Sequence, residues 1–226
     1  MKNKDREFFD IFENFAFNEV AKEKTIEVPE NLRFMAVLAA LIGCGGTDAY
    51  MQMLPAALDN GLSPAEIKEI VYQSAAYVGY GRMLPFLNAT NKVFEKKSVH
   101  LPEEIRSTVP QNLRTEKGAD AQAEIFGEHM KEAWKNGLVN RWLACNCFGD
   151  YYTRKGLSLA QRELITFCFL MAQGGCEPQL IAHAKGNINM GNDEQFLIKI
   201  IMHCLPYIGY PRSLNAVECV HKAMGS

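Results

Sequence analysis

The sequence has neither a surplus of positive charge nor a long uncharged apolar run. Its 24 Lys and Arg residues are outnumbered by 26 Asp and Glu residues, and the net charge is −2, so we expect no nucleic-acid partner. The longest uncharged apolar stretch, residues 34–46, is too short to cross a bilayer, and the N-terminal residues are too acidic for a signal peptide. Seven cysteines without a regular spacing favour a reducing environment, so we expect a cytoplasmic protein that does not enter membranes.

Several common catalytic and structural signatures are also missing. The chain contains no G-x-S-x-G nucleophile motif, no H-E-x-x-H zinc motif and no Walker phosphate loop. Cys145 and Cys147 would point to different faces of a helix, so we predict no metal site there. Alternating strand patterns are absent as well. These absences argue against the familiar serine hydrolases, zinc proteases and nucleotide-binding folds.

What the sequence does contain is the same pattern twice. Residues 77–84 read YVGYGRML and residues 207–214 read YIGYPRSL, and Gly61 and Gly191 keep the same spacing of 130 positions. A repeat with a fixed spacing indicates one structural unit used twice. We place the first copy at 1–97, a proline-containing linker at 98–113 and the second copy at 114–226.

Nearly every segment of both copies has the apolar period of a helix. Two capping boxes mark helix starts at Ser63 and Ser158, and Asn192 with Gln195 forms a weaker version. The broadly apolar helices must be buried on all sides, so we expect the two copies to pack against each other. The remaining apolar surface is expected to lie between chains of a homo-oligomer. The fold class predicted is all-α.

The second copy carries the residues that can do chemistry. Glu163 opens an apolar helix that ends at a Gly-Gly pair, Cys176 begins the next helix, and His183 follows seven residues later. Seven residues are two helical turns, so the thiol and the imidazole share one face. A thiol at a helix N-terminus is expected to have a lowered pKa, and an imidazole can shuttle protons. Antiparallel return of the second helix would bring Glu163 or Arg162 beside His183.

Each of these residues also has a plain structural explanation. A histidine in a mostly apolar helix is often a hydrogen-bonded structural residue. A cysteine at a helix start, such as Cys176, often has no reactive role, and an acid in a first helical turn, such as Glu163, can simply complement the helix dipole. These readings stay open beside the catalytic ones.

Several motifs together resemble the carboxymuconolactone decarboxylase family, which also holds the alkylhydroperoxidase D-type proteins. They are CFGDYYTRKGLS at 147–158, the following QREL, the GGCEPQL run, HAKG at 183–186 and YIGYPRSL. The resemblance covers 114–226 almost entirely and 10–97 more faintly. It implies a tandem duplicated helical fold with about six helices in each unit. It also implies a homo-oligomer, in which a trimer of fused chains would mimic a hexamer.

The resemblance also implies site residues. The family's aromatic-Gly-acid element matches Phe148-Gly149-Asp150, and its histidine matches His183. Its basic positions match Arg154, Arg162 and Lys185, although Arg is more usual at the last one. The alkylhydroperoxidase branch has a glutamate, a Cys-x-x-Cys pair and a histidine, which match Glu163, Cys176 and His183. Gln179 stands where that branch has its second cysteine, so the local disulfide partner is missing.

The first copy departs further from the family pattern. Phe34, Thr47 and Met53 stand at the positions of Glu163, Cys176 and His183. We therefore expect the first copy to be structural, completing a pocket or an interface without a catalytic residue of its own.

Three hypotheses for function follow. The favoured one is a cofactor-independent decarboxylase or lactone-processing enzyme that acts on a small carboxylated ring. His183 would be its general acid, and Asp150 or Glu163 would orient His183. Substrate carboxylates would be held by Arg154, Arg162 or Lys185. The second hypothesis is a thiol-dependent peroxidase or redox relay that uses Cys176 with Glu163 and His183. The third is a ligand-binding or assembly protein without catalysis.

Overall fold

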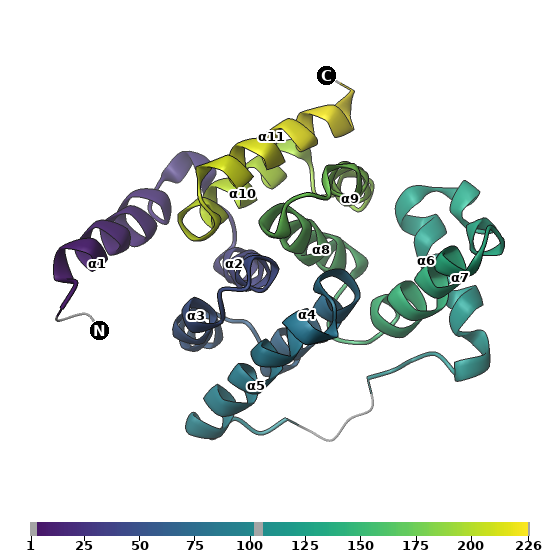
Figure 1. The fold of residues 1–226 in the computed structure, drawn as a ribbon, viewed down its shortest axis with the longest axis horizontal. Coiled ribbons are helices and arrows are strands. Elements are labelled where there is room, and N and C mark those ends of the chain that lie inside the picture. Colours follow the sequence, from purple (N-terminus) through teal and green to yellow (C-terminus); the bar gives the residue numbers. More distant parts are fainter. Residues whose placement is uncertain (1–3, 102–105, 226) are drawn as a thin grey trace.

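A computed structural model describes residues 4–101 and 106–225, and the regular elements in these ranges are all helices (Figure 1). The α-helices are α1 (Arg6–Glu13), α2 (Glu30–Cys44), α3 (Thr47–Asp59), α4 (Pro64–Val78), α5 (Tyr80–Lys96), α6 (Arg114–Phe126), α7 (Leu138–Trp142), α8 (Leu159–Gln173), α9 (Glu177–Asn189), α10 (Glu194–Ile208) and α11 (Tyr210–Met224). The π-type segments are η1 (Asn14–Val20) and η6 (Leu143–Tyr152), and the 3₁₀ segments are η2 (Lys24–Ile26), η3 (Gln111–Leu113), η4 (Glu128–Met130) and η5 (Ala133–Lys135). The predicted all-α class is confirmed.

The helices repeat in the order that the sequence repeat predicts. The series α2, α3, α4 and α5 is matched in order by α8, α9, α10 and α11, the first three pairs are equal in length, and a π-type segment precedes each series. The duplicated helical unit is therefore confirmed. The boundaries at 97 and 114 stay a prediction, and residues 102–105 of the predicted linker lie outside the described residues.

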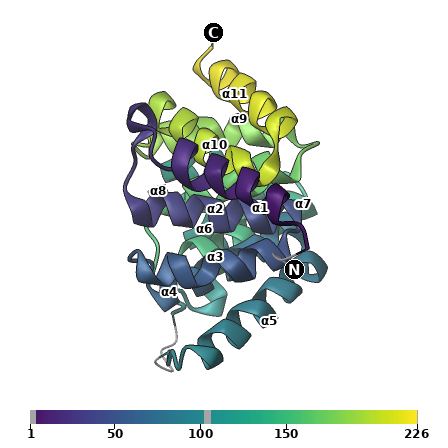
Figure 2. The ribbon, with the colours of Figure 1, turned by 90° about the vertical axis from the view of Figure 1, so that its left-hand side faces the viewer.

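The core is built around α2 and α8, which pack side by side in the middle of the molecule (Figure 1). Helices α4 and α5 lie on one side of this pair, and α10 and α11 lie on the other (Figure 2). Gly43 allows the close approach, because a Cβ atom there would lie 2.5 Å from the carbonyl oxygen of Phe169. The residues that the sequence marks for burial on all sides are buried in this core, namely Leu38, Leu41, Ile42, Phe167, Phe169 and Met171.

The helix starts follow the capping chemistry of the sequence. Complete capping boxes at Ser63 and Ser158 open α4 and α8, as predicted. The weaker prediction at Asn192 is wrong by one residue, because Asp193 caps α10 by accepting a hydrogen bond from the backbone N–H of Phe196 at 2.8 Å. Asn192 instead donates its amide to the carbonyl of Ala160 at the start of α8.

Helix α6 and segment η6 pack closely and carry residues toward the centre of the molecule. Glycines make this contact possible, because a Cβ atom at Gly118 would overlap the carbonyl of Ala144 and one at Gly149 would overlap the carbonyl of Arg114. Segment η6 winds as a π-type helix, a form that is often found at functional sites. It places Cys147 and Tyr152 on the side that faces α4 and α8.

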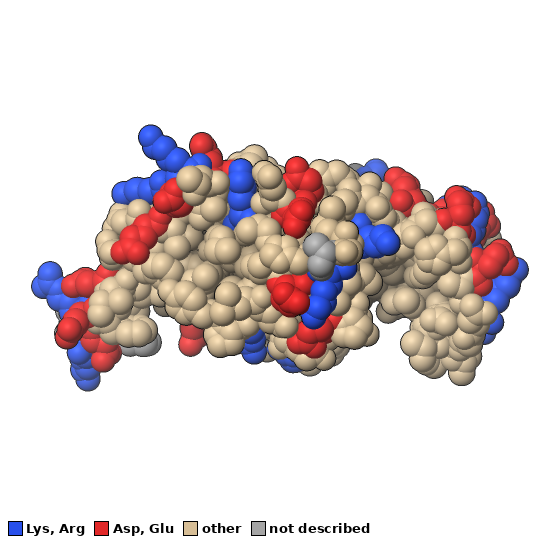
Figure 3. All heavy atoms as spheres, turned by 90° about the horizontal axis from the view of Figure 1, so that it is seen from above, with Lys and Arg blue, Asp and Glu red and all other residues tan. Residues whose placement is uncertain are grey.

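The outer surface carries mixed charge. Figure 3 shows acidic and basic side chains intermixed over one face of the described residues, in keeping with the net charge of −2. Among the described helices, none combines the length and hydropathy that crossing a bilayer requires.

Candidate functional site

A cavity of about 620 Å³ lies where the two copies meet. Its wall combines residues of α4 from the first copy with residues of α6, η4, η6, α8 and α9 from the second. Tyr77, Phe126, Cys147, Cys176 and His183 all line it. A larger hollow of about 970 Å³ lies between residues 21–30 and α10, but it contains none of the predicted site residues. The first copy therefore contributes to the cavity that holds His183, as we expected.

His183 is held in this wall by Glu163. Its Nδ1 atom lies 2.8 Å from Glu163 Oε2, and the Glu163 side chain is fully buried while that of His183 is 12% exposed. An ionised carboxylate can only accept, so the Nδ1–H of the ring donates to Glu163. This fixes the tautomer and leaves Nε2, on the opposite side of the ring, for a ligand.

A cluster of hydroxyl groups stands behind Glu163. Tyr152 donates its hydroxyl to Glu163 Oε1 at 2.8 Å, and its own oxygen lies 2.8 Å from both Thr166 Oγ1 and the hydroxyl of Tyr77. The Cys147 thiol donates to the Tyr77 hydroxyl at 3.5 Å. Since the single proton of Tyr152 points to Glu163, Thr166 and Tyr77 must donate to Tyr152. The chain of donors therefore ends on the Glu163 carboxylate.

Burial keeps these donors neutral. Burial, with the nearby Cys147 and Glu163, raises the pKa of Tyr77 well above its usual value, and burial with the Glu163 carboxylate does the same to the pKa of Tyr152. Burial also raises the pKa of Cys147 to about 12. At neutral pH these three groups are therefore hydrogen-bond donors around one carboxylate.

Two aromatic rings and a glycine fix the position of the imidazole. The rings of Tyr77 and Phe126 meet the His183 ring edge to face, with centroid distances of 5.6 Å and 5.3 Å. One turn further along α9, a Cβ atom at Gly186 would lie 2.6 Å from Glu163 Oε2 and 2.9 Å from the Phe126 ring. Only glycine at this position therefore lets Glu163 and Phe126 both reach His183 without displacement.

Cys176 lines the same cavity, but its thiol is not activated. Burial and the neighbouring Glu177 carboxylate raise the pKa of Cys176 above its usual value. The Sγ atom donates to the carbonyl of Leu170 at 3.4 Å. The expectation of a lowered pKa at this helix start is therefore wrong, because loss of solvent and the Glu177 charge outweigh the hydrogen bond with Gln173, which lowers the pKa.

Asp150 is not placed beside His183. Its carboxylate pairs with Arg114 at 2.6 Å and accepts a hydrogen bond from Asn146 at 3.0 Å. Glu163 alone of the two predicted carboxylates contacts the imidazole, because Asp150 lies on the face of η6 that packs against α6. The structure thus does not support Asp150 as the orienting group.

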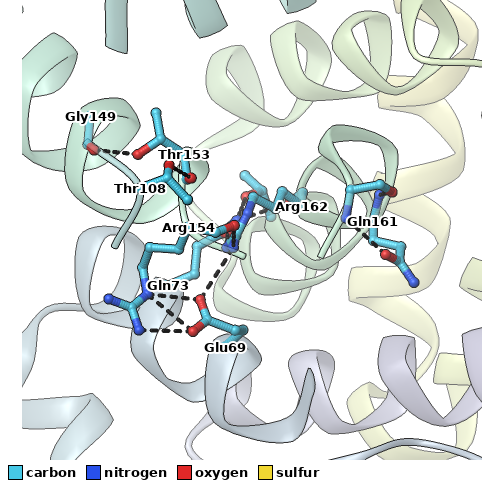
Figure 4. A network of polar contacts seen from close by, with 10 residues as sticks. Glu69, Gln73, Thr108, Gly149, Thr153, Arg154, Gln161 and Arg162 are labelled. Atoms are coloured by element: carbon cyan, nitrogen blue, oxygen red, sulfur yellow. Dashed lines mark hydrogen bonds and ion pairs between the residues drawn. The ribbon is translucent and has the colours of Figure 1, made fainter. Parts of the chain in front are cut away.

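The predicted substrate-binding cations are engaged elsewhere (Figure 4). Arg154 Nε lies 3.0 Å from Glu69 Oε2, and Arg162 Nη2 lies 3.2 Å from the same oxygen. Arg162 is fully buried, and its Nη1 donates to Gln73 at 2.8 Å. Lys185 is exposed on α9. None of these three cations lines the cavity of His183, so the structure does not support their assignment to substrate binding there.

The corresponding position in the first copy is filled by apolar packing. Met53 and Phe34, which stand at the positions of His183 and Glu163, are both buried in the core. The hydroxyl of Tyr207 donates to Met53 Sδ at 3.8 Å, whereas Tyr77, its counterpart in the other copy, contacts His183 through its ring. Each copy thus places a tyrosine against the other copy, and only the tyrosine of the first copy meets a histidine.

Comparison with known proteins adds the family. The family model described as "Carboxymuconolactone decarboxylase family" matches this chain twice, at residues 6–92 and 137–222. These two segments together cover well over half of the sequence. The chain belongs to the carboxymuconolactone decarboxylase family. The resemblance noted in the sequence is confirmed, and both copies are members of the family.

A curated relative gives a more specific comparison. The 4-carboxymuconolactone decarboxylase of Acinetobacter baylyi is 28% identical over 125 residues, which is 50% of this chain and 90% of the relative. The matched stretch is about as long as one of the two copies. The likeness supports a decarboxylase-like function at the level of the family.

Sequence reasoning missed several residues of the site. Tyr77 stands in the repeated YVGYGRML motif and Tyr152 in the CFGDYY motif, yet neither motif shows that the two hydroxyls meet. Gln122 and Phe126, which also line the cavity, lie in the helix-like segment before the CFGDYY motif. The repeat was the available signal. It predicts that the two copies pack together, and residues of one copy can then line the site of the other.

Proposed function

We propose that this chain is a cofactor-independent decarboxylase or lactone-processing enzyme for a small carboxylated ring, with His183 as the general acid. The observation that carries the proposal is the buried Glu163–His183 pair at 2.8 Å in the wall of a largely apolar cavity. A histidine aligned by a buried carboxylate, with its second nitrogen left for a ligand, has the arrangement of an acid–base catalyst.

The reaction needs a proton source and a place for electrons. In a γ-carboxylated, α,β-unsaturated lactone, the bond between the ring carbon and the carboxylate breaks and CO₂ leaves. The electron pair shifts through the ring double bond onto the conjugated carbonyl. The carbon next to that carbonyl then takes a proton, which the protonated His183 supplies from Nε2 while Glu163 stabilises the imidazolium through Nδ1. The His183 imidazole then regains its proton from solvent.

The family supports the same class of reaction. The Acinetobacter relative is named for the decarboxylation of 4-carboxymuconolactone. The convergent polar groups around His183 also count against a binding protein without chemistry, because such a protein needs no buried series of donors to the carboxylate that holds an imidazole.

A substitution of Cys176 separates decarboxylation from thiol chemistry. We expect Cys176→Ser to keep CO₂ release from a γ-carboxylated lactone within about threefold, because the thiol's raised pKa leaves little thiolate at neutral pH. CO₂ release by the wild type and the variant is measured with the same lactone.

The same reasoning predicts slow oxidation of the thiol. Mass spectrometry after mild peroxide should find Cys176 no faster to react than the partly exposed Cys145. Rapid and selective sulfenic acid at Cys176, together with no CO₂ release by the wild type, would favour the peroxidase alternative instead.

We also propose that the chain assembles with copies of itself through α7. The large core helices are already covered within one chain, so the apolar surface that remains lies elsewhere. Leu138, Val139 and Trp142 on α7 are each more than half exposed, and the adjacent Leu143 lines the cavity. A second copy seated on this stripe would therefore cover apolar surface and close the cavity mouth.

Light scattering tests the assembly. The wild type is expected to give a particle of about three times the 25.4 kDa chain, as in a closed cyclic trimer. Val139→Glu, which buries a charge in the proposed contact, should shift the particle toward a single chain. A stable single-chain particle for the wild type at micromolar concentration would contradict the proposal.

A further inference from the structure

Gln122 is the buried polar residue in the cavity that lacks a partner. It is 2% exposed, and its Oε1 atom has no hydrogen-bond partner among the described residues. It lies one turn before Phe126 on α6, and both side chains line the cavity. Phe126 contacts the His183 ring at 5.3 Å between centroids, so Gln122 belongs to the same cavity wall as the imidazole.

An amide in this state is unfavourable unless something binds it. A buried polar group without a hydrogen bond destabilises the folded protein, and native proteins keep few of them. A half-turn of the terminal torsion exchanges oxygen and nitrogen, so the amide can present either an acceptor or a pair of donors to the cavity. The unpartnered Oε1 atom, on a residue that lines the cavity, therefore points to a ligand.

The other polar groups of the cavity are already used or lie at its rim. Gln173 accepts a hydrogen bond from Arg82 at 3.3 Å, Gln179 and His129 are exposed, and the Tyr77 hydroxyl is directed to Tyr152. Gln122 and His183 Nε2 are thus the interior groups that remain for a ligand. An acceptor on the ligand needs a donor, and the amide NH₂ supplies one.

The charge of the lining limits the ligand further. The described residues that line the cavity include no Lys, Arg, Asp or Glu. A carboxylate in an apolar cavity is strongly disfavoured unless a cation pairs with it. Glu163 already pairs with the His183 imidazolium, so the described lining offers no further cation, and a second carboxylate on the ligand would add one more uncompensated charge.

We propose that Gln122 binds the lactone carbonyl oxygen of the ligand through its amide NH₂, and that the cavity takes ring compounds with a single carboxylate. This inference rests on the proposed function for the class of ring. The carbonyl is the group that gains negative charge as CO₂ leaves, so a fixed donor there also favours the reaction.

The substitution Gln122→Met tests the role of the amide. Met keeps the unbranched shape and removes both polar atoms. The melting temperature of the free protein should rise by about 2–4 °C, since an unpartnered buried oxygen is lost. The affinity for 5-oxo-2,5-dihydrofuran-2-carboxylate, measured by calorimetry, should fall about threefold to tenfold, as for a lost neutral hydrogen bond. A structural role alone would give a lower melting temperature and an unchanged affinity.

The matched control is Gln195→Met on the exposed first turn of α10. This variant should change neither the melting temperature nor the affinity. The wild type should bind the singly charged lactone at least about tenfold more tightly than 4-carboxymuconolactone, which carries a second carboxylate, because no further interior cation is available. Equal or tighter binding of the doubly charged compound would overturn the inference, and so would failure of the wild type to bind either lactone.

These outcomes are distinguishable from failure of the proposed function. If the lactone binds and Gln122→Met weakens it, but no CO₂ is released, the proposed reaction fails and the ligand contact stands. If CO₂ is released while Gln122→Met melts lower and binds as the wild type does, only the Gln122 inference is overturned.

Discussion

Replacing His183 with alanine is expected to lower kcat for CO₂ release by about 10²–10⁴-fold, which is the usual contribution of a positioned general acid. The imidazole is the titratable group that lines the cavity and is held by a buried carboxylate. Without it, the carbon that gains the electron pair has no aligned proton donor. Steady-state assays with a γ-carboxylated lactone measure the loss.

Loss of a buried partner also affects stability, so a second variant is needed. In His183→Asn, the amide nitrogen can take the place of Nδ1 and still donate to Glu163, but no group remains that can give up a proton. This variant should keep the melting temperature nearer to that of the wild type than His183→Ala does, and should lose as much kcat. Activity within twofold of the wild type in both variants would contradict the assignment of His183.

The fold was largely readable from the sequence because its signals are local. The capping boxes at Ser63 and Ser158, the Gly-Gly end of α8 and the helical apolar period each depend on residues a few positions apart. The repeat added the larger plan, since a unit used twice must bury its apolar faces against its copy. Where the local signal was weaker, at Asn192, the predicted cap was displaced by one residue to Asp193.

The site was readable only in part, because its contacts join distant segments. Glu163 and His183 could be paired from the antiparallel return of one helix on the next. Tyr77 could not be placed at the site, because it comes from the other copy. The pKa of Cys176 could not be predicted either, because it depends on how much solvent the folded cavity excludes. The position of Gln122 depends on how α6 packs over α9, which no local pattern specifies.

The arginines Arg154 and Arg162 were also misassigned, because their partner lies far away in the sequence. Arg154 and Arg162 stand in the motifs that carry the family resemblance, and a motif arginine suggests a bound carboxylate. In the structure, that carboxylate is Glu69 of the first copy, far away in the sequence. An ion pair between copies thus takes the place of the substrate contact that the sequence suggested.

The substitution Glu69→Ala is expected to have the largest effect on stability. The Glu69 and Arg162 side chains are both fully buried, and the oxygen of Glu69 lies 3.2 Å from Arg162 Nη2. Burial lowers the pKa of Arg162 and Glu69 opposes that change, so removing the acid leaves a charged guanidinium buried without its counter-ion. Breaking such a pair costs about 3–5 kcal/mol, or about 6–20 °C in melting temperature for a chain of this size.

Two further variants separate the lost charge pairing from lost volume. Glu218→Gln removes an acid from the exposed pair with Lys222, and it should change the stability by less than about 1 kcal/mol, since surface pairs contribute little. Glu69→Ala combined with Arg162→Met should be less destabilising than Glu69→Ala alone, because the fully buried guanidinium is removed and only the partly exposed Arg154 is left without Glu69. Chemical denaturation of the wild type, these three variants and the Arg162→Met single variant gives the comparison. A double variant at least as unstable as the sum of its two single variants would show that Glu69 stabilises the halves through packing and not through Arg162.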